Sequence, residues 1–306
     1  MKGLVRWVLR LGAWGLIAAL VLGWLGRLSP PLDAFSHLRL HLLALSVVAV
    51  PILMLGRRWR SAVTLAVVCV VSLVLTWPFL PGLEPASVNG PPDLTVAQLN
   101  MRFNNPRPAL LEQELRRTGA DVLLLQEVSK RTMRVVDRLK DYPHRHVCRF
   151  RDFRGVAVVS RVAFRTTLPC AADGGLAVAT LDLPRPVTVV SIHTYWPWPA
   201  RQWQQLRSVR PLLSRVEPPL VVAGDFNAVP WSAAVGYVER HTRTRAVPGL
   251  RFTFNTLHLQ RGDTRRGGLP IDHVLLSPDV TLLDIHLMPH VGSDHLGTVA
   301  KVALSR

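Results

Sequence analysis

Residues 220–230 read LVVAGDFNAVP, an apolar segment that runs directly into the polar sequence Gly-Asp-Phe-Asn. The four apolar residues Leu220–Ala223 have the length and composition of a short buried strand. Asp225 and Asn227 follow at the point where that strand ends. Loops at one end of a sheet are where a rigid scaffold presents catalytic groups. This stretch therefore predicts a functional site at a sheet edge.

The same pattern recurs on both sides of this stretch. Further short apolar strands are predicted at Leu94–Leu99, Val122–Leu125, Val156–Ser160, Ala177–Leu181, Val187–Ile192, Asp272–Leu276 and Val299–Leu304. Polar residues mark the ends of several of these strands, namely Asn100, Glu127, His193, Asp272 and the triplet Ser293-Asp294-His295. Together with Asp225 and Asn227 they can converge on one pocket.

Helical spacing accompanies the strands, at Pro108–Arg117 and at Trp203–Leu213. Many short strands with intervening helices predict an α/β or α+β sandwich. We expect this domain to occupy residues 94–306, after an extended linker at residues 81–93 that is rich in proline and glycine.

The chemistry that these polar residues can perform is narrow. The sequence contains no Gly-x-Ser-x-Gly motif and no Walker loop. Oxygen donors predominate, and hard oxygen ligands suit Mg²⁺ or Mn²⁺ rather than zinc. A divalent ion with carboxylates, histidines and many arginines is what phosphoester cleavage needs, because the negative charge on the phosphate must be neutralised.

Residues 1–80 have a different composition, with Asp33 as their single acidic residue. Three apolar runs, at about residues 11–26, 40–56 and 61–80, approach the roughly 20 residues that cross a bilayer. A cleaved signal peptide is the alternative for the first run, but no convincing cleavage site precedes Pro30. We therefore expect three transmembrane helices.

Two clusters of basic residues flank the apolar runs, one before the first run (Lys2, Arg6, Arg10) and one between the second and third (Arg57, Arg58, Arg60). The positive-inside rule places both clusters in the cytoplasm. Three crossings then leave the later residues on the outer side of a bacterial cell membrane. Cys148 and Cys170 would lie in that oxidising compartment, where a disulfide between them is a hypothesis. The net charge of +17 favours an anionic partner such as lipid head groups, a phosphorylated substrate or nucleic acid. No protein partner is identifiable from the sequence.

Six motifs in order carry a family resemblance. They are QLN at 98–100, LLQEV at 124–128, SIHTYWP at 191–197, GDFNAVP at 224–230, IDHVLLS at 271–277 and GSDHLG at 292–297. The sequence resembles the endonuclease/exonuclease/phosphatase superfamily, which includes pancreatic deoxyribonuclease, abasic-site endonucleases, neutral sphingomyelinases and inositol-polyphosphate 5-phosphatases. With the N-terminal spans it looks like the membrane-anchored teicoplanin-resistance branch. The resemblance implies a four-layer α/β/β/α sandwich, similar to deoxyribonuclease.

The resemblance also implies a role for each motif residue. Glu127 would be the principal metal ligand, with Asn100 beside it and Asp294 near the metal. Asp225 would position or deprotonate the attacking water, while His295 would face the phosphate with Asp272 as its carboxylate partner. Phosphate contacts would come from Asn227 and His193, with Tyr195 as a less favoured substitute for His193.

The interpretation that we favour is a metal-dependent phosphohydrolase that acts on a phosphoester or pyrophosphate outside the membrane. The topology and the branch resemblance suggest a lipid-linked polyprenyl phosphate as a candidate substrate. An anchored nuclease, a phospholipid or sphingolipid phosphodiesterase, and a non-enzymatic protein with a relic site are the alternatives. Trp196 and Trp198 are either a packed loop or an aromatic lip at the bilayer interface. The pair Arg265–Arg266 is either a solvated loop or a contact with an anionic substrate.

Overall fold

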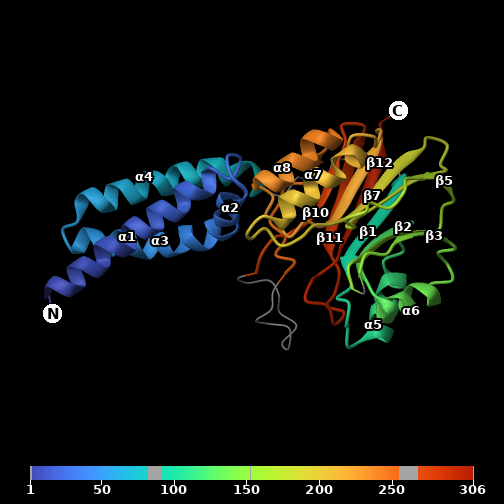
Figure 1. Cartoon of the computed structure of the whole chain (residues 1–306), viewed down its shortest axis with the longest axis horizontal. Coiled ribbons are helices and arrows are strands. Elements are labelled where there is room, and N and C mark those ends of the chain that lie inside the picture. Colours follow the sequence, from blue (N-terminus) through green and yellow to red (C-terminus); the bar gives the residue numbers. More distant parts are fainter. Residues whose placement is uncertain (1, 82–90, 152, 255–267, 306) are drawn as a thin grey trace.

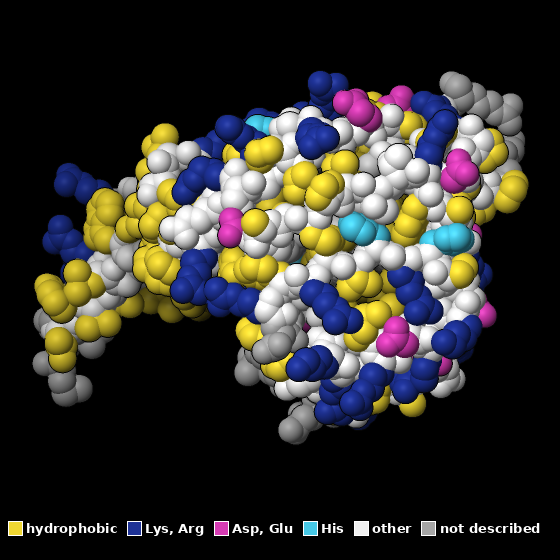
Figure 2. All heavy atoms as spheres, turned by 45° about the vertical axis from the view of Figure 1, so that its right-hand side comes forward, with side chains coloured by type: hydrophobic (Ala, Val, Ile, Leu, Met, Phe, Trp, Pro, Cys, Tyr) yellow, Lys and Arg dark blue, Asp and Glu magenta, His cyan; other side chains and the backbone are white. Residues whose placement is uncertain are grey.

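The apolar runs of the N-terminal region form three long helices, α1 (Lys2–Trp24), α3 (Arg39–Leu55) and α4 (Trp59–Thr76). By length and apolar composition all three can cross a membrane. The short helix α2 (Pro30–Asp33) and the 3₁₀ turn η1 (Ala34–Leu38) connect α1 to α3, and the 3₁₀ turn η2 (Trp77–Phe79) follows α4. Apolar side chains cover this region, at the left of Figure 2, and Lys and Arg side chains are spread over the rest of the molecule.

This computed structural model describes residues 2–81, 91–151, 153–254 and 268–305. Most of the expected linker, and the pair Arg265–Arg266, therefore lie outside the described residues. The remainder of the chain forms two six-stranded sheets, which lie to the right of the helices in Figure 1.

The first sheet has the strand order β11-β12-β1-β2-β4-β3. Its strands are β1 (Leu94–Asn100), β2 (Val122–Val128), β3 (His144–Cys148), β4 (Gly155–Ser160), β11 (Val280–Leu287) and β12 (Thr298–Leu304). The second sheet has the order β5-β6-β7-β8-β10-β9. Its strands are β5 (Phe164–Thr167), β6 (Leu176–Leu181), β7 (Val187–His193), β8 (Leu220–Asp225), β9 (Arg245–Ala246) and β10 (Asp272–Leu276).

Alternating apolar side chains in each strand build the layers, because successive side chains point to opposite faces of a sheet. In β8, Val221 and Ala223 face the core between the sheets, whereas Leu220 and Val222 face the outer helices. Helices α5 (Pro108–Arg117) and α6 (Lys130–Arg138) cover the first sheet, and α7 (Arg201–Leu213) and α8 (Ala233–Thr242) cover the second. The predicted α/β/β/α sandwich is confirmed.

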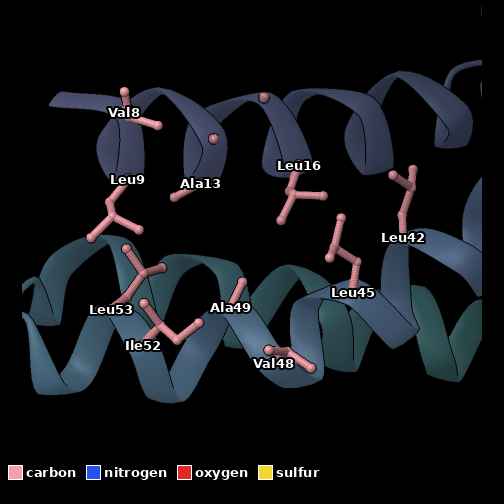
Figure 3. Close-up of a pocket in the computed structure, with 12 residues that line it drawn as sticks. Val8, Leu9, Ala13, Leu16, Leu42, Leu45, Val48, Ala49, Ile52 and Leu53 are labelled. Atoms are coloured by element: carbon pink, nitrogen blue, oxygen red, sulfur yellow. The ribbon is translucent and has the colours of Figure 1, made fainter. Parts of the chain in front are cut away.

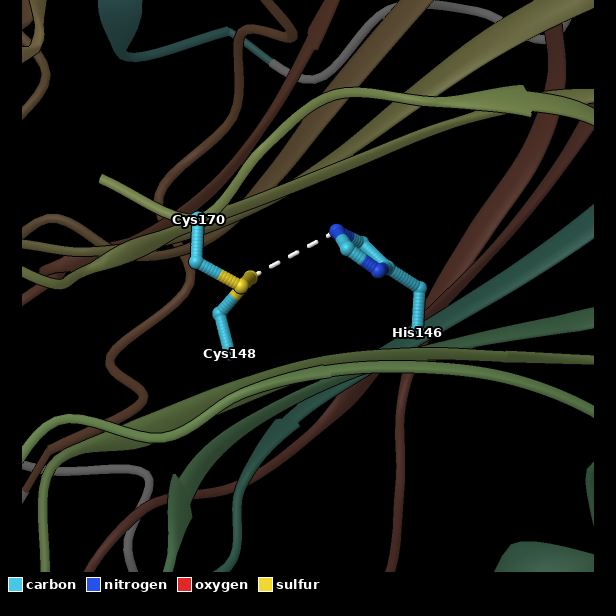
Figure 4. The surroundings of a disulfide bond; sticks show 3 residues. All are labelled: His146, Cys148 and Cys170. Carbon is cyan, nitrogen blue, oxygen red and sulfur yellow. Dashed lines mark hydrogen bonds between the residues drawn. A yellow bond between two sulfur atoms is a disulfide. The ribbon is translucent and has the colours of Figure 1, made fainter.

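One disulfide ties the two sheets together. Cys148 at the end of β3 is bonded to Cys170, which follows β5 in the other sheet, and their Cα atoms are 5.3 Å apart. His146 Nε2 lies 3.4 Å from Cys148 Sγ, as Figure 4 shows. The cysteine pair that the sequence offered as a hypothesis is joined in the structure.

A cavity of about 500 Å³ lies between α1 and α3 (Figure 3). Its lining is apolar, from residues such as Leu9, Leu16, Leu45 and Ile52. Because it offers no charged or metal-ligating side chain, this cavity cannot perform phosphoester chemistry, and the site has to be sought in the sandwich.

Candidate active site

The register of three neighbouring strands places three of the predicted residues side by side. β7 pairs with β8 in parallel, with His193 opposite Asp225, and β10 pairs with β8 antiparallel, with Asp272 opposite Asp225. Gly224 makes this close approach possible, since it has a φ of 150° and any Cβ there would collide with the carbonyl oxygen of Ile192. The Gly-Asp-Phe-Asn stretch therefore ends in the middle of the site.

His295 reaches the same carboxylates from the loop before β12. Its Nδ1 atom lies 2.8 Å from Asp272 Oδ2, and its Nε2 atom lies 3.7 Å from Asp225 Oδ2. One ligand atom from each of these three residues lies within 4.8 Å of the others, so the cluster is compact enough to hold a metal ion. All three side chains are buried.

The first sheet contributes Asn100, at the end of β1, and Glu127, near the end of β2. Asn100 Nδ2 donates to Glu127 Oε1 at 3.2 Å and to Asp225 Oδ2 at 3.0 Å, and so links the two sheets. Glu127 lies where the register between β2 and β4 shifts, and its φ is 55°. Such a bulge re-aims a side chain, here toward Asn100. The backbone N–H of Phe103 donates to the other Glu127 oxygen at 2.8 Å.

Asn227 forms the turn after β8, with a φ of 45°. Its backbone N–H donates to Asp225 Oδ1 at 2.8 Å, and its side-chain amide donates to the carbonyl oxygen of Thr194 at 2.9 Å. His193 Nε2 lies 3.5 Å from Asp225 Oδ2, while its buried Nδ1 has no hydrogen-bond partner among the described residues. Asp225 is therefore the centre around which the site is arranged.

Burial and neighbouring charges set the protonation of these groups. Burial alone lowers the pKa of His295, but the carboxylates of Asp272 and Asp225 outweigh it and raise that pKa to about 10. Burial raises the pKa of Asp225 to about 7, although the charge on His295 opposes this rise. Burial, with the nearby charges of Arg154 and His295, holds the pKa of His193 well below its usual value. At neutral pH the site thus combines an imidazolium, a neutral imidazole and a carboxyl group poised to exchange a proton.

Two of the predicted residues, Asp294 and Tyr195, have fewer contacts with the other site residues. Asp294 is half-buried beside His295, and its charge contributes to raising the pKa of His295. Within the described ranges no hydrogen bond or ion pair joins Asp294 to Glu127 or Asn100. Tyr195 is half-buried at the rim of the site.

Arg154 was not singled out by the sequence, which contains many arginines. Its guanidinium carbon lies 3.9 Å from the centre of the Tyr195 ring, and its Nη2 atom donates to the carbonyl oxygen of Thr194 at 3.4 Å. The carboxylates of Glu127 and Asp225 act on it electrostatically, although burial dominates and lowers its pKa. Its position directly before Gly155, at the start of β4, was the only signal available.

Exposed aromatic rings gather at the same end of the sandwich. Among the described residues from Pro91 onward, the exposed large apolar side chains are Phe103, Phe153, Trp196 and Trp198. The Phe103 and Phe153 rings lie 5.4 Å apart, beside the backbone that binds Glu127. Trp196 and Trp198 follow His193 along the chain. The polar site therefore has an apolar margin.

The donor set suits a hard divalent cation. The carboxylate oxygens of Glu127 and Asp225 are brought together by the shared side-chain amide of Asn100. Asp272 Oδ1 is buried without a hydrogen-bond partner among the described residues. Cys148 and Cys170 are bonded to each other in the disulfide, so they offer no thiolate. Oxygen donors of this kind fit Mg²⁺ or Mn²⁺ better than a soft metal.

Comparison with known proteins agrees with this geometry. The model of the Endonuclease/Exonuclease/phosphatase family matches residues 97–295, and the chain belongs to this family. Members of the family are metal-dependent hydrolases of phosphoester bonds. No curated protein matches the sequence. The branch of membrane-anchored teicoplanin-resistance proteins is not confirmed by these comparisons.

Several solved structures share the fold at low sequence identity. An endonuclease/exonuclease/phosphatase from Beutenbergia cavernae is 21% identical, with a TM-score of 0.55, covering 70% of this chain and 72% of that one. TDP2 from D. rerio, in complex with a single-strand DNA product, is 18% identical, with a TM-score of 0.55 and coverage of 68% and 98%. An AP endonuclease from Archaeoglobus fulgidus is 17% identical, with a TM-score of 0.53 and coverage of 68% and 98%.

Proposed function

We propose that this protein is a divalent-metal-dependent phosphohydrolase of a bacterial cell membrane, acting at the outer face on a lipid-linked phosphoester or pyrophosphate of the polyprenyl type. One observation carries the proposal. The His295–Asp272–Asp225 cluster lies next to Asn100 and Glu127, in a site whose Asn227 turn contacts the connection between the first two apolar helices. A phosphate at the bilayer surface is the anion nearest to such a site.

Glu127 and Asn100 are the proposed holders of Mg²⁺ (or Mn²⁺), with Asp294 nearby. When bound, such an ion neutralises negative charge on the phosphate oxygens. The Asp225–Asp272–His295 cluster is a poorer cation site, because a protonated imidazole whose pKa is about 10 has no lone pair to offer. We therefore assign these three residues to proton and charge handling.

Asp225 is the proposed base. With a pKa of about 7 it can orient a water molecule and accept its proton near neutral pH. Protonated His295 would donate a hydrogen bond to a phosphate oxygen through Nε2 while Asp272 holds Nδ1. This arrangement stabilises the charge that develops as water attacks phosphorus and the bond to the leaving oxygen breaks.

The remaining polar groups would bind the phosphate. Asn227 and His193 flank Asp225, and Tyr195 supports the guanidinium of Arg154 from one side. A guanidinium held over a ring has less freedom to move, and its N–H groups are then placed to bind a phosphate through two hydrogen bonds.

The basic residues at the ends of the helices support the proposed outward orientation of the sandwich. The clusters before α1 and between α3 and α4 favour the cytoplasm. The Cys148–Cys170 disulfide supports the same side for the sandwich, because disulfides persist in oxidising compartments.

The aromatic margin supports an amphiphilic substrate. Trp196 is 47% exposed and Trp198 is 58% exposed, and tryptophan is favoured at membrane interfaces. Replacing both with serine should reduce hydrolysis of a lipid phosphate by about tenfold or more, and hydrolysis of a soluble phosphoester much less. Equal losses on both substrates would remove this role for the two rings.

A nuclease is the second candidate, favoured by the net charge of +17 and by the fold shared with TDP2 bound to a single-strand DNA product and with an AP endonuclease. A phospholipid or sphingolipid phosphodiesterase is the third. The discriminating experiment incubates the purified protein and Mg²⁺ with a polyprenyl pyrophosphate, sphingomyelin and plasmid DNA, beside a His295→Ala control. Phosphate release from the first substrate alone supports the proposal. Plasmid nicking that disappears in the control would overturn it.

A further inference from the structure

The segment between α1 and α3, residues 25–38, carries polar side chains that are buried against the sandwich. We call it the α1–α3 connection. Asp33, Ser36 and His37 are each at most 5% exposed, although they lie between two apolar helices. In Figure 1 this segment, which contains α2, lies at the end of the helical region that meets α8 and the other loops of the sandwich. Its polar groups therefore have partners in the other part of the chain.

Asp33 binds the first turn of α8. Its Oδ1 atom accepts from the backbone N–H of Ala233 at 2.8 Å, and its Oδ2 atom accepts from that of Ala234 at 3.0 Å. These are N–H groups that a helix leaves without partners inside itself, and a carboxylate there also interacts favourably with the helix dipole. Gly26 lets the chain come this close, because a Cβ at that position would lie 2.6 Å from Asp33 Oδ1.

His37 binds the turn that carries Asn227. Its Nε2 atom lies 3.2 Å from the carbonyl oxygen of Asn227, and its Nδ1 atom lies 3.2 Å from the carbonyl oxygen of Asp33. The Asn227 turn has a left-handed φ, which costs conformational energy unless surrounding contacts hold it. His37 supplies one of those contacts from outside the sandwich.

Trp231, between the Asn227 turn and α8, adds contacts with the α1–α3 connection and with the segment after α4. Its indole N–H donates to the carbonyl oxygen of Ser36 at 2.8 Å, and its ring lies 6.3 Å from that of Phe79, just beyond α4. The backbone N–H of Gly249 donates to the carbonyl oxygen of Phe79 at 3.1 Å. Residues 227–234 are thus held by the α1–α3 connection on one side and by the end of α4 on another.

We propose that the α1–α3 connection is a working part of the catalytic centre, in which Asp33 and His37 are positioning residues for the turn that binds phosphate. This inference rests on the proposed function, since it takes Asn227 as a phosphate contact. The inference adds to the proposed function that phosphate binding depends on the membrane region even when the substrate is soluble and needs no bilayer.

The test uses full-length protein in detergent, p-nitrophenyl phosphate as the soluble substrate, and Mg²⁺. Asp33→Ala and His37→Ala should each lower kcat/KM by about tenfold, which corresponds to about 1.4 kcal/mol. Most of this change should appear in KM, and the inhibition constant of inorganic phosphate should rise in parallel. Asp33→Asn, which keeps one acceptor oxygen, should recover part of the loss.

Matched controls come from an aspartate and a histidine that, among the described residues, have no hydrogen bond or ion pair with the α1–α3 connection or the Asn227 turn. Asp93 also accepts a backbone N–H, from Leu304 at 2.7 Å, and His286 is an exposed histidine beside Asp284. Asp93→Ala and His286→Ala should leave KM unchanged. Equal KM values in the Asp33 and His37 variants and in the wild type, at temperatures where all are folded, would overturn the inference.

Failure of the proposed function can be told apart from failure of this inference. A wild-type protein that hydrolyses no phosphate compound contradicts the proposed function, and hydrogen exchange then decides the inference. Asp33→Ala should speed amide exchange in peptides covering residues 225–236 and leave β1 unchanged. Unchanged exchange in residues 225–236 would contradict the role of Asp33.

Discussion

The charge on His295 depends on its neighbour Asp272. Asp272 accepts from Nδ1 at 2.8 Å and is the largest cause that raises the His295 pKa, against the effect of burial. Asp272→Asn should lower kcat by about 10²–10⁴-fold, the range for a lost acid–base or electrostatic group. His295→Ala in the same assay shows how much activity the imidazole supplies. An Asp272→Asn enzyme within threefold of the wild type would contradict the pairing.

The sign of the pH dependence follows from the same pair. The proposed mechanism needs protonated His295, so activity should be lost as the pH rises through about 10. Asp272→Asn removes a charge that raises the pKa of His295, and the remaining activity should therefore be lost at a lower pH than in the wild type. The measurement is kcat/KM against pH for both proteins.

Arg154 should act mainly on substrate binding. Its guanidinium is fixed over Tyr195 and close to the carboxylates that surround the proposed metal. Arg154→Gln should raise KM for phosphate substrates by about 10- to 100-fold, as expected for a charged hydrogen bond worth roughly 1.5–3 kcal/mol. The KM of Arg154→Lys should lie between those of the wild type and Arg154→Gln, because an ammonium group keeps the charge and loses the planar arrangement of N–H donors.

The control for Arg154→Gln is the same substitution at Arg215, an arginine on the connection between α7 and β8. Arg215→Gln removes one positive charge from the sandwich, on the sheet opposite to that of Arg154, without changing the site residues. A similar rise in KM in both variants would show that overall charge, and not the position of Arg154, governs binding.

At the scale of elements, the strand-end motifs were predictable because short apolar runs reveal β1, β2, β7, β8 and β10 directly. The pairing of parallel strands then brings their ends to one edge, as the register of His193 with Asp225 shows. The bulge at Glu127 was not predictable, since it depends on how β2 pairs with β4. The sequence placed Glu127 beyond a strand that in fact continues to Val128.

Other elements escaped the sequence for a related reason. β3 (HRHVC) and β5 (FRTT) are short edge strands whose side chains are mostly not buried, so they lack an apolar run. α6 has four basic residues in nine, which hide its apolar face in the sequence, although Ser129 and Thr132 form a capping box and the helix packs against the first sheet. The contact of Asp33 with α8 joins residues 200 positions apart, and no local pattern encodes it.

The disulfide between β3 and the segment after β5 should stabilise the sandwich. It closes a separation of 22 residues, for which the chain-entropy model gives roughly 3 kcal/mol. Replacing Cys148 and Cys170 together with serine should lower the melting temperature of the purified protein by several degrees. Cys69→Ser, at the free cysteine in α4, is the matched control and should change it little. Equal melting temperatures in the double variant and the control would contradict a stabilising bond.

For the whole molecule, the decisive question is on which side of the membrane the sandwich lies. Three crossings with basic residues on the cytoplasmic side put Ser305, near the end of β12, outside and Arg60, at the start of α4, inside. On a Cys69→Ser background, Ser305→Cys should react with a membrane-impermeant maleimide in intact cells, after any outer permeability barrier has been opened. Arg60→Cys should react only after lysis. Because α4 is the only candidate span between the two sites among the described residues, they can share a side only if α4 does not cross. Labelling of Arg60→Cys alone in intact cells would reverse the topology, and would leave the disulfide and the outward-facing site without the compartment that they require.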